Sequence, residues 1–147
     1  MSRPRWSRLA PAVAGIALAI LIIWLGAPLV LQRVVLDGDW QLTAGTLDGS
    51  PIPIVSDHPT TLTIAGGRLS GRGPCNEYGG YLDVSGSALR PHDIFHTLAA
   101  CIDVRGTAAE SAYFAALDRV SRFQRDGPRL ILSGSGVELK FEPARKP

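Results

Sequence analysis

Hydrophobic residues are concentrated in one uncharged run near the N-terminus. No Asp, Glu, Lys or Arg occurs in residues 9–31, and residues 12–24 are almost wholly Ala, Val, Ile and Leu. As a helix this run would measure about 34 Å, enough to cross the hydrocarbon core of a bilayer. Three arginines precede the run and Arg33 follows it, which favours a cytoplasmic N-terminus. The pattern predicts that residues 1–35 form a basic cytoplasmic head and a single-pass transmembrane anchor.

A cleaved signal peptide is the alternative interpretation of the same run. Such a peptide has a shorter apolar region, with small residues before its cleavage point. The best cleavage candidate, residues 25–27, is followed by Pro28, a poor residue at that position. No cysteine follows the run closely, which argues against attachment as a lipoprotein. Both interpretations predict that the rest of the chain is exported.

From residue 36 onward, apolar and polar residues alternate with the period of two that is typical of strands. In residues 60–65, Leu62 and Ile64 share one face, and two glycines follow as a hairpin turn. The last alternating stretch places apolar residues opposite charged ones over residues 137–142. Strands are therefore predicted over residues 39–42, 60–65, 68–71, 78–84, 88–90, 130–132 and 137–142.

Two stretches between these strands are predicted to be loops. Residues 45–53 are rich in turn-forming residues, and Pro51 and Pro53 exclude a central strand there. The second loop is predicted from Pro91 to His96, because a proline interrupts the alternation.

One helix is predicted, beginning at Thr107. Thr107 and Glu110 have the spacing of a capping box, in which hydroxyl and carboxylate satisfy each other's backbone amides. Apolar residues follow at helical spacing, namely Tyr113, Phe114, Leu117 and Val120. Arginines would lie at the C-terminal end of the helix, where positive charge suits its dipole, namely Arg119, Arg122 and Arg125.

These elements predict an α+β fold. Residues 36–147 would form a compact antiparallel β-rich domain with one main helix, preceded by the N-terminal transmembrane helix. All thirteen acidic residues lie at or beyond Asp37, so this domain has 11 basic against 13 acidic residues, a balance of −2. Because nucleic-acid binding needs a basic surface, nucleic acid is excluded as a partner.

Several residues also occur in a familiar order. Trp40, a strand–turn–strand ending in Ser70 and Gly71, and then Cys75 and Asn76 are similar to the first half of a META domain. Four further features resemble the second half of that domain, namely Thr97 to Cys101, Glu110, Ala116 with Leu117, and a final Leu-Ile-Leu hairpin. The resemblance covers about residues 39–141, nearly all of the predicted exported part.

The resemblance implies a compact β-rich fold with one helix, as in the HslJ-like heat-shock proteins of bacterial envelopes. Members of this family are often exported or lipid-anchored, and no enzymatic reaction is well established for them. This chain differs from the lipoprotein members in its apparent transmembrane anchor.

The two cysteines, Cys75 and Cys101, are the only ones in the chain. In an oxidising compartment they most simply form a disulfide. Their separation of 26 residues would then stabilise the fold by about 3.5 kcal/mol in the chain-entropy model. A buried reduced pair, or metal or catalytic use of the thiols, are the alternatives. Thiol catalysis would need a depressed thiol pKa, for which the local sequence holds no signal.

A small set of residues is predicted to form a possible binding surface, with packing as the alternative role: Asn76, Tyr78, Tyr81, His92 and His96. His92 and His96 are four residues apart, but Pro91 denies them the helix that makes this spacing a metal-ligand pair. No catalytic residue, metal site or cofactor is predicted.

The sequence therefore predicts a non-enzymatic binding or structural module in envelope stress tolerance. It would be a monomer in the bacterial inner membrane with its C-terminal domain in the periplasm, where an envelope protein is a possible partner. One alternative is an inhibitor or chaperone-like partner of an envelope enzyme that inserts the loop Pro91 to His96. Another is a thiol-dependent hydrolase.

Overall fold

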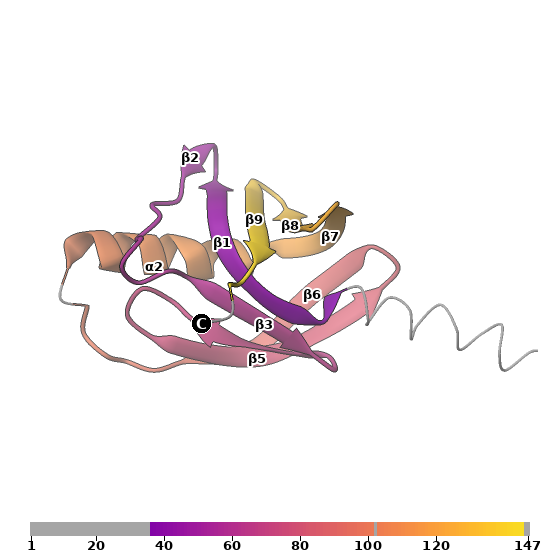
Figure 1. Ribbon diagram of the computed structural model, residues 1–147, viewed down its shortest axis with the longest axis horizontal. Helices are drawn as coiled ribbons and strands as arrows, with labels where there is room; N and C mark the ends of the chain where they lie inside the picture. The colour runs from indigo at the N-terminus through magenta and orange to yellow at the C-terminus, as the bar shows by residue number, and fades with distance from the viewer. Residues whose placement is uncertain (1–35, 102, 146–147) are drawn as a thin grey trace, which may run out of the picture.

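A computed structural model of the protein describes residues 36–101 and 103–145 (Figure 1). The predicted basic head and membrane anchor, residues 1–35, lie outside the described residues. In the described ranges, no helix is long and apolar enough to cross a membrane. The elements in chain order are β1 (Gly38–Leu47), β2 (Ser50–Pro51), β3 (Thr61–Ala65), β4 (Arg68–Arg72), β5 (Glu77–Ser85), β6 (Ala88–His96), α2 (Val104–Leu117), β7 (Val120–Asp126), β8 (Arg129–Gly134) and β9 (Val137–Pro143).

The strands form one antiparallel, barrel-like sheet in the order β2-β1-β3-β4-β5-β6-β7-β8-β9. Strand β1 closes it, because its first part pairs with β3 and most of its length pairs with β9. A register shift between Leu42 and Ala44 marks a bulge in β1, and bulges bend a strand. The predicted antiparallel β-rich fold with one main helix is confirmed for the described residues.

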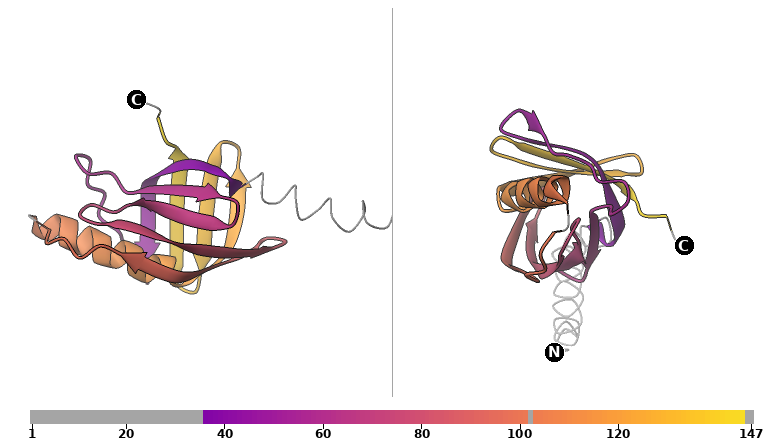
Figure 2. Two further views of the ribbon diagram at one scale, coloured as in Figure 1. Left: turned by 90° about the horizontal axis from the view of Figure 1, so that it is seen from below. Right: turned by 90° about the vertical axis from the view of Figure 1, so that its left-hand side faces the viewer.

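The sheet has one weak seam, between β6 and β7, which pair only at Ala88 and Arg122. In the right-hand view of Figure 2, α2 lies between the two halves of the sheet. The helix buries its inner face there, and Tyr113, Ala116 and Leu117 are at most 1% exposed. Full burial of a large apolar side chain contributes about 1.5–3 kcal/mol, so the helix is an integral part of the core.

The alternation of apolar residues predicts the core correctly. Leu62 and Ile64 of β3 point inward, and the Gly66-Gly67 turn connects β3 to β4 as predicted. Three side chains of β9 are likewise buried, namely Val137, Leu139 and Phe141. The short β2 pairs only with the end of β1, in agreement with the exclusion of a central strand around Pro51. The loop predicted over residues 45–53 is wrong at its start, because β1 continues to Leu47.

The predicted loop from Pro91 to His96 is wrong, since these residues complete β6. Proline is tolerated in strands whose second edge is largely unpaired, and β6 pairs with β7 at one position only. Asp93 has a φ of 52°, and its neighbourhood contains the register shift of the β5–β6 pair. The proposed inhibitory loop is thus part of the sheet.

The predicted helix start at Thr107 is also wrong. Helix α2 begins at Val104, and Asp103 is its N-cap, accepting a hydrogen bond from the Arg105 backbone amide at 3.1 Å. The Thr107 hydroxyl donates to the Asp103 carbonyl at 3.3 Å. The Glu110 carboxylate does not reach back to Thr107, because it accepts hydrogen bonds from the backbone amides of Cys75 and Asn76. The spacing of Thr107 and Glu110 does not distinguish a capping-box glutamate from a glutamate that binds a distant loop.

The C-terminal end of α2 differs from the prediction as well. The helix ends at Leu117, and Val120 already starts β7, which also carries Arg122 and Arg125. Arg125 therefore lies over the Trp40 ring, 4.5 Å from its centroid, rather than at a helix end. Val120 fits the helical spacing of apolar residues, but it is buried as the first residue of the following strand.

Replacing the observed N-cap, Asp103→Ala, should lower the free energy of unfolding by about 1 kcal/mol. Thr107→Ala should change it by less than about 0.5 kcal/mol, because Thr107 is exposed and does not cap the helix. Urea unfolding of both variants measures the difference. A larger loss for Thr107→Ala than for Asp103→Ala would contradict the assigned helix start.

The start of the domain is firmly attached to its core. Leu36 is 1% exposed, and the Trp40 indole N–H donates to the Leu36 carbonyl at 3.1 Å. The Asp37 carboxylate accepts a hydrogen bond from the Gly66 amide at 3.3 Å. The chain therefore joins the sheet at one defined place, beside the β3–β4 turn.

Candidate functional site

The loop between β4 and β5 and the connection between β6 and α2 meet at one end of the sheet. A disulfide joins Cys75 of the loop to Cys101 of the connection, with Cα atoms 5.2 Å apart. We call this region the disulfide end. Gly106 of α2 lies against it, since a Cβ there would be 3.3 Å from the Cys75 sulfur. The disulfide thus connects two segments that lack sheet pairing of their own.

Glu110 is the central polar residue of the disulfide end. Its side chain projects from α2 and is 7% exposed. One carboxylate oxygen accepts hydrogen bonds from the backbone amides of Cys75 and Asn76, at 2.9 and 2.8 Å. The other accepts from the Asn76 side-chain amide at 2.6 Å. A Cβ on Gly73 would come within 2.6 Å of this carboxylate, so glycine is what lets the loop approach it.

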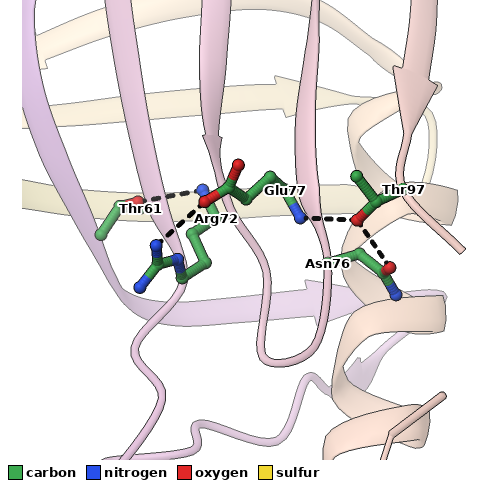
Figure 3. Close-up of polar contacts among 5 residues, drawn as sticks. All are labelled: Thr61, Arg72, Asn76, Glu77 and Thr97. Atoms are coloured by element: carbon green, nitrogen blue, oxygen red, sulfur yellow. Dashed lines mark hydrogen bonds and ion pairs between the residues drawn. The ribbon is translucent and has the colours of Figure 1, made fainter. Parts of the chain in front are cut away.

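Asn76 continues this network toward the β6–α2 connection. Its side-chain oxygen accepts from the Thr97 hydroxyl at 2.8 Å and from the Ala99 amide at 2.7 Å. Figure 3 shows Thr97 also bound to the Glu77 amide, and Glu77 bound to Arg72. These contacts tie the connection to β4 and β5.

Three possible metal-ligand atoms lie within 4.8 Å of one another here, from Cys75, Cys101 and Glu110. The two sulfurs are bonded to each other, so neither is a thiolate, and the carboxylate already accepts three N–H groups. Metal ligation and nucleophilic catalysis both require the thiolate form of cysteine. In the described residues this cluster therefore serves to hold loops together.

A pair of tyrosines is buried behind this network. Tyr78 is 4% and Tyr113 0% exposed, and their hydroxyl oxygens are 2.6 Å apart. Tyr78 donates to the Thr61 carbonyl at 2.7 Å, so Tyr113 is the donor to Tyr78. Burial raises the pKa of both hydroxyls well above the ordinary tyrosine value.

This pair predicts a loss of stability at alkaline pH. A folded-state pKa above the unfolded value of about 10 gives stability that is complete below pH 10 and falls as pH rises further. Each tyrosine contributes up to about 1.4 kcal/mol per pH unit. Urea unfolding between pH 9 and 11.5 should therefore show a steeper decline for the wild type than for Tyr113→Phe. Parallel declines would contradict the assignment.

The outer face of β4, β5 and β6 carries side chains in three cross-strand rows. The strand registers define the rows Arg68–Tyr81–His92 and Ser70–Gly79–Phe95. The third row is Arg72–Glu77–Thr97, in which Thr97 follows the end of β6 and is held to Glu77 by hydrogen bonds. We call this surface the outer face. Phe95 is 66% and Tyr81 43% exposed. A shallow hollow of about 570 Å³ lies along the face.

Glycine shapes the middle of the outer face. A Cβ on Gly79 would lie 2.7 Å from the Phe95 ring, so the ring rests directly on the β5 backbone. Beside it, the Tyr81 ring stacks on His92 with centroids 5.7 Å apart. The result is a platform of exposed rings over two strands.

The predicted binding surface is divided by the structure. Tyr81 and His92 lie together on the outer face, whereas Asn76 and Tyr78 are buried. His96 stacks on Phe114 of α2, with centroids 4.8 Å apart. Phe95 was not among the residues predicted for this surface. The signal in the sequence was Gly79, whose missing side chain lets the Phe95 ring approach the β5 backbone.

The fold and the disulfide end define the class of protein, a small antiparallel β-rich domain with one helix. The META domain family model matches residues 32–146, and the chain therefore belongs to the META domain family. An NMR structure of a protein from Burkholderia xenovorans is 28% identical with a TM-score of 0.65, covering 78% of this chain and 87% of that one.

Two other structures share the fold at lower identity. A second protein solved by NMR is 16% identical with a TM-score of 0.56, covering 73% of this chain and 89% of that one. A crystal structure of a duf4847 family protein from Bacteroides vulgatus ATCC 8482 is 14% identical with a TM-score of 0.56, covering 80% and 99%. The comparison with curated proteins finds no match.

Proposed function

We propose that this chain is a non-enzymatic binding or structural module that supports envelope stress tolerance in bacteria. In this proposal the N-terminal segment anchors the chain in the inner membrane, and the META domain lies in the periplasm. The uncharged run of residues 9–31, with its flanking arginines, supports the anchor. Family membership supports the type of domain.

One observation carries the non-enzymatic part of the proposal. The groups best suited to chemistry at the disulfide end, Glu110 and the two cysteines, are bonded to each other or to backbone amides. A catalytic carboxylate needs an oxygen free to contact the substrate, whereas both oxygens of Glu110 accept hydrogen bonds from the β4–β5 loop. The outer face, by contrast, presents Tyr81 and Phe95 to solvent, and exposed aromatic side chains are typical of binding surfaces.

A strain lacking the gene tests this function under heat or envelope stress. Complementation with the double variant Tyr81→Ala/Phe95→Ala should fail although the protein accumulates normally. Glu110→Gln should reduce tolerance only in proportion to its loss of folded protein. If Glu110→Gln abolishes tolerance at an unchanged level of folded protein, the carboxylate has a chemical role and the proposal is wrong.

The anchor is tested separately by N-terminal sequencing of the protein from the membrane fraction. We expect the mature chain to keep its N-terminal segment. A mature chain that begins near Pro28 would overturn the anchor and indicate a cleaved signal peptide.

A further inference from the structure

We propose that the outer face binds a neutral glycan, which deepens the proposed function by naming the ligand class of the binding module. The inference rests on that function and on three properties of the face: exposed rings, a backbone floor and arginines already in contact with other side chains of the protein. Sheet faces are known to bind oligosaccharides in other small β domains.

The exposed rings are the first property. Tyr81 and Phe95 belong to neighbouring cross-strand rows, and rows of one face are about 7 Å apart along a strand. Aromatic side chains offer large, flat apolar area with a polar edge. The Phe95 ring, which is the more exposed of the two, can contact the C–H face of a sugar ring. The Tyr81 ring is flanked by Arg68 and His92, so it offers its exposed edge and hydroxyl to a neighbouring unit of the same chain.

The rim and floor supply hydrogen-bonding groups around those rings. The hollow is bordered by Ser70, Glu77 and Thr97, and its floor is formed at Gly79 and Gly80. Hydroxyl and carboxylate side chains match the hydroxyl groups of a sugar, which both donate and accept. The Thr97 hydroxyl already bonds to Asn76 and the Glu77 carboxylate to Arg72, and both groups keep oxygen lone pairs that can accept a further hydrogen bond from a sugar hydroxyl.

Charge on the outer face favours a neutral ligand over an anionic one. Arg72 is paired with Glu77 at 2.9 Å, and Arg68 lies over the Tyr81 ring, 5.7 Å from its centroid. His92 lies between two carboxylates, those of Asp83 at 3.7 Å and Asp93 at 3.1 Å. The two arginines of this described surface thus already face a carboxylate and a ring, which leaves less positive charge directed at an anionic polymer.

Titration of the full-length ¹⁵N-labelled protein in dodecylphosphocholine micelles tests the inference. The probes are cellotetraose and N-acetylated chitotetraose, with oligogalacturonate as the anionic comparison. At least one neutral probe should give saturable shifts of the Gly79 and Gly80 amides. Tyr81→Ala and Phe95→Ala should each weaken binding about 2- to 10-fold.

The matched control is Leu98→Ala, because Leu98 is 89% exposed and lies outside the three rows. It should bind as the wild type does. The inference is overturned if neither neutral probe gives a saturable shift, if an anionic probe binds more tightly, or if both aromatic variants bind normally. Such a result leaves the stress-tolerance experiment unaffected, so failure of the ligand class and failure of the function are distinguishable.

Discussion

Glu110→Gln should lower the free energy of unfolding by about 3 kcal/mol. Hydrogen bonds to charged groups contribute about 1.5–3 kcal/mol, and a buried donor left unpaired costs a similar amount. Both oxygens of Glu110 face N–H donors, from Cys75 and Asn76. Glutamine has only one oxygen, so in either orientation its NH₂ group meets at least one N–H donor. Urea unfolding of the purified chain measures the loss.

Glu138→Gln is the matched control, because it removes the same charge from an ion pair with Lys140 whose side chains are nearly half exposed. Surface pairs of this kind contribute about 0–1 kcal/mol. The control should therefore stay close to the wild type. Equal losses in the two variants would show that Glu110 acts through net charge rather than through its bonds to the β4–β5 loop.

Removal of the disulfide should have an effect of similar size. Cys75→Ala together with Cys101→Ala should lower the free energy of unfolding by about 3.5 kcal/mol, as expected for a loop of this length. Thiol alkylation of the native protein without reduction should label neither cysteine. The fold should persist, because the core and the Glu110 network do not depend on the sulfur atoms.

Reduction provides the control for this second prediction. Dithiothreitol should destabilise the wild type by a similar amount and leave the double variant unchanged. Stoichiometric alkylation of the untreated protein would contradict the disulfide, and an unchanged midpoint of the double variant would contradict its stabilising role.

The alternating strands were predictable because their side chains obey a local rule. In β3 and β9, every second residue is buried, and a period of two in the sequence is sufficient to find them. The same rule also indicates that Tyr78 and Tyr81, three positions apart on one strand, face opposite sides. Applied to the predicted binding surface, it would have separated the buried tyrosine from the exposed one.

The helix start and the role of Glu110 were not predictable in this way. Thr107 and Glu110 fit a local capping pattern, whereas the actual partners of Glu110 are Cys75 and Asn76, on a loop far away in the sequence. A buried carboxylate gains more from three amide donors than from one exposed cap. The sequence contains the donors, but only the fold brings them together.

Strand β6 shows a similar limit. Pro91 interrupts the local pattern of a strand, yet its effect depends on whether a neighbouring strand needs its N–H group. The weak seam between β6 and β7 removes that need, and this property of the whole sheet has no signature in residues 88–96.

The pairing of β1 with β9 has a consequence for the order in which the chain acquires its structure. Trp40 pairs with Pro143, and Leu42 with Phe141. The second edge of β1 therefore stays unpaired until β9 has folded against it. Contacts between distant parts of a sequence make folding slow, because a long loop must close first. Synthesis of nearly the entire chain must therefore precede completion of the core. A ribosome-bound or truncated chain lacking β9 remains open along β1, exposing a strand edge to proteases and to other unfinished chains.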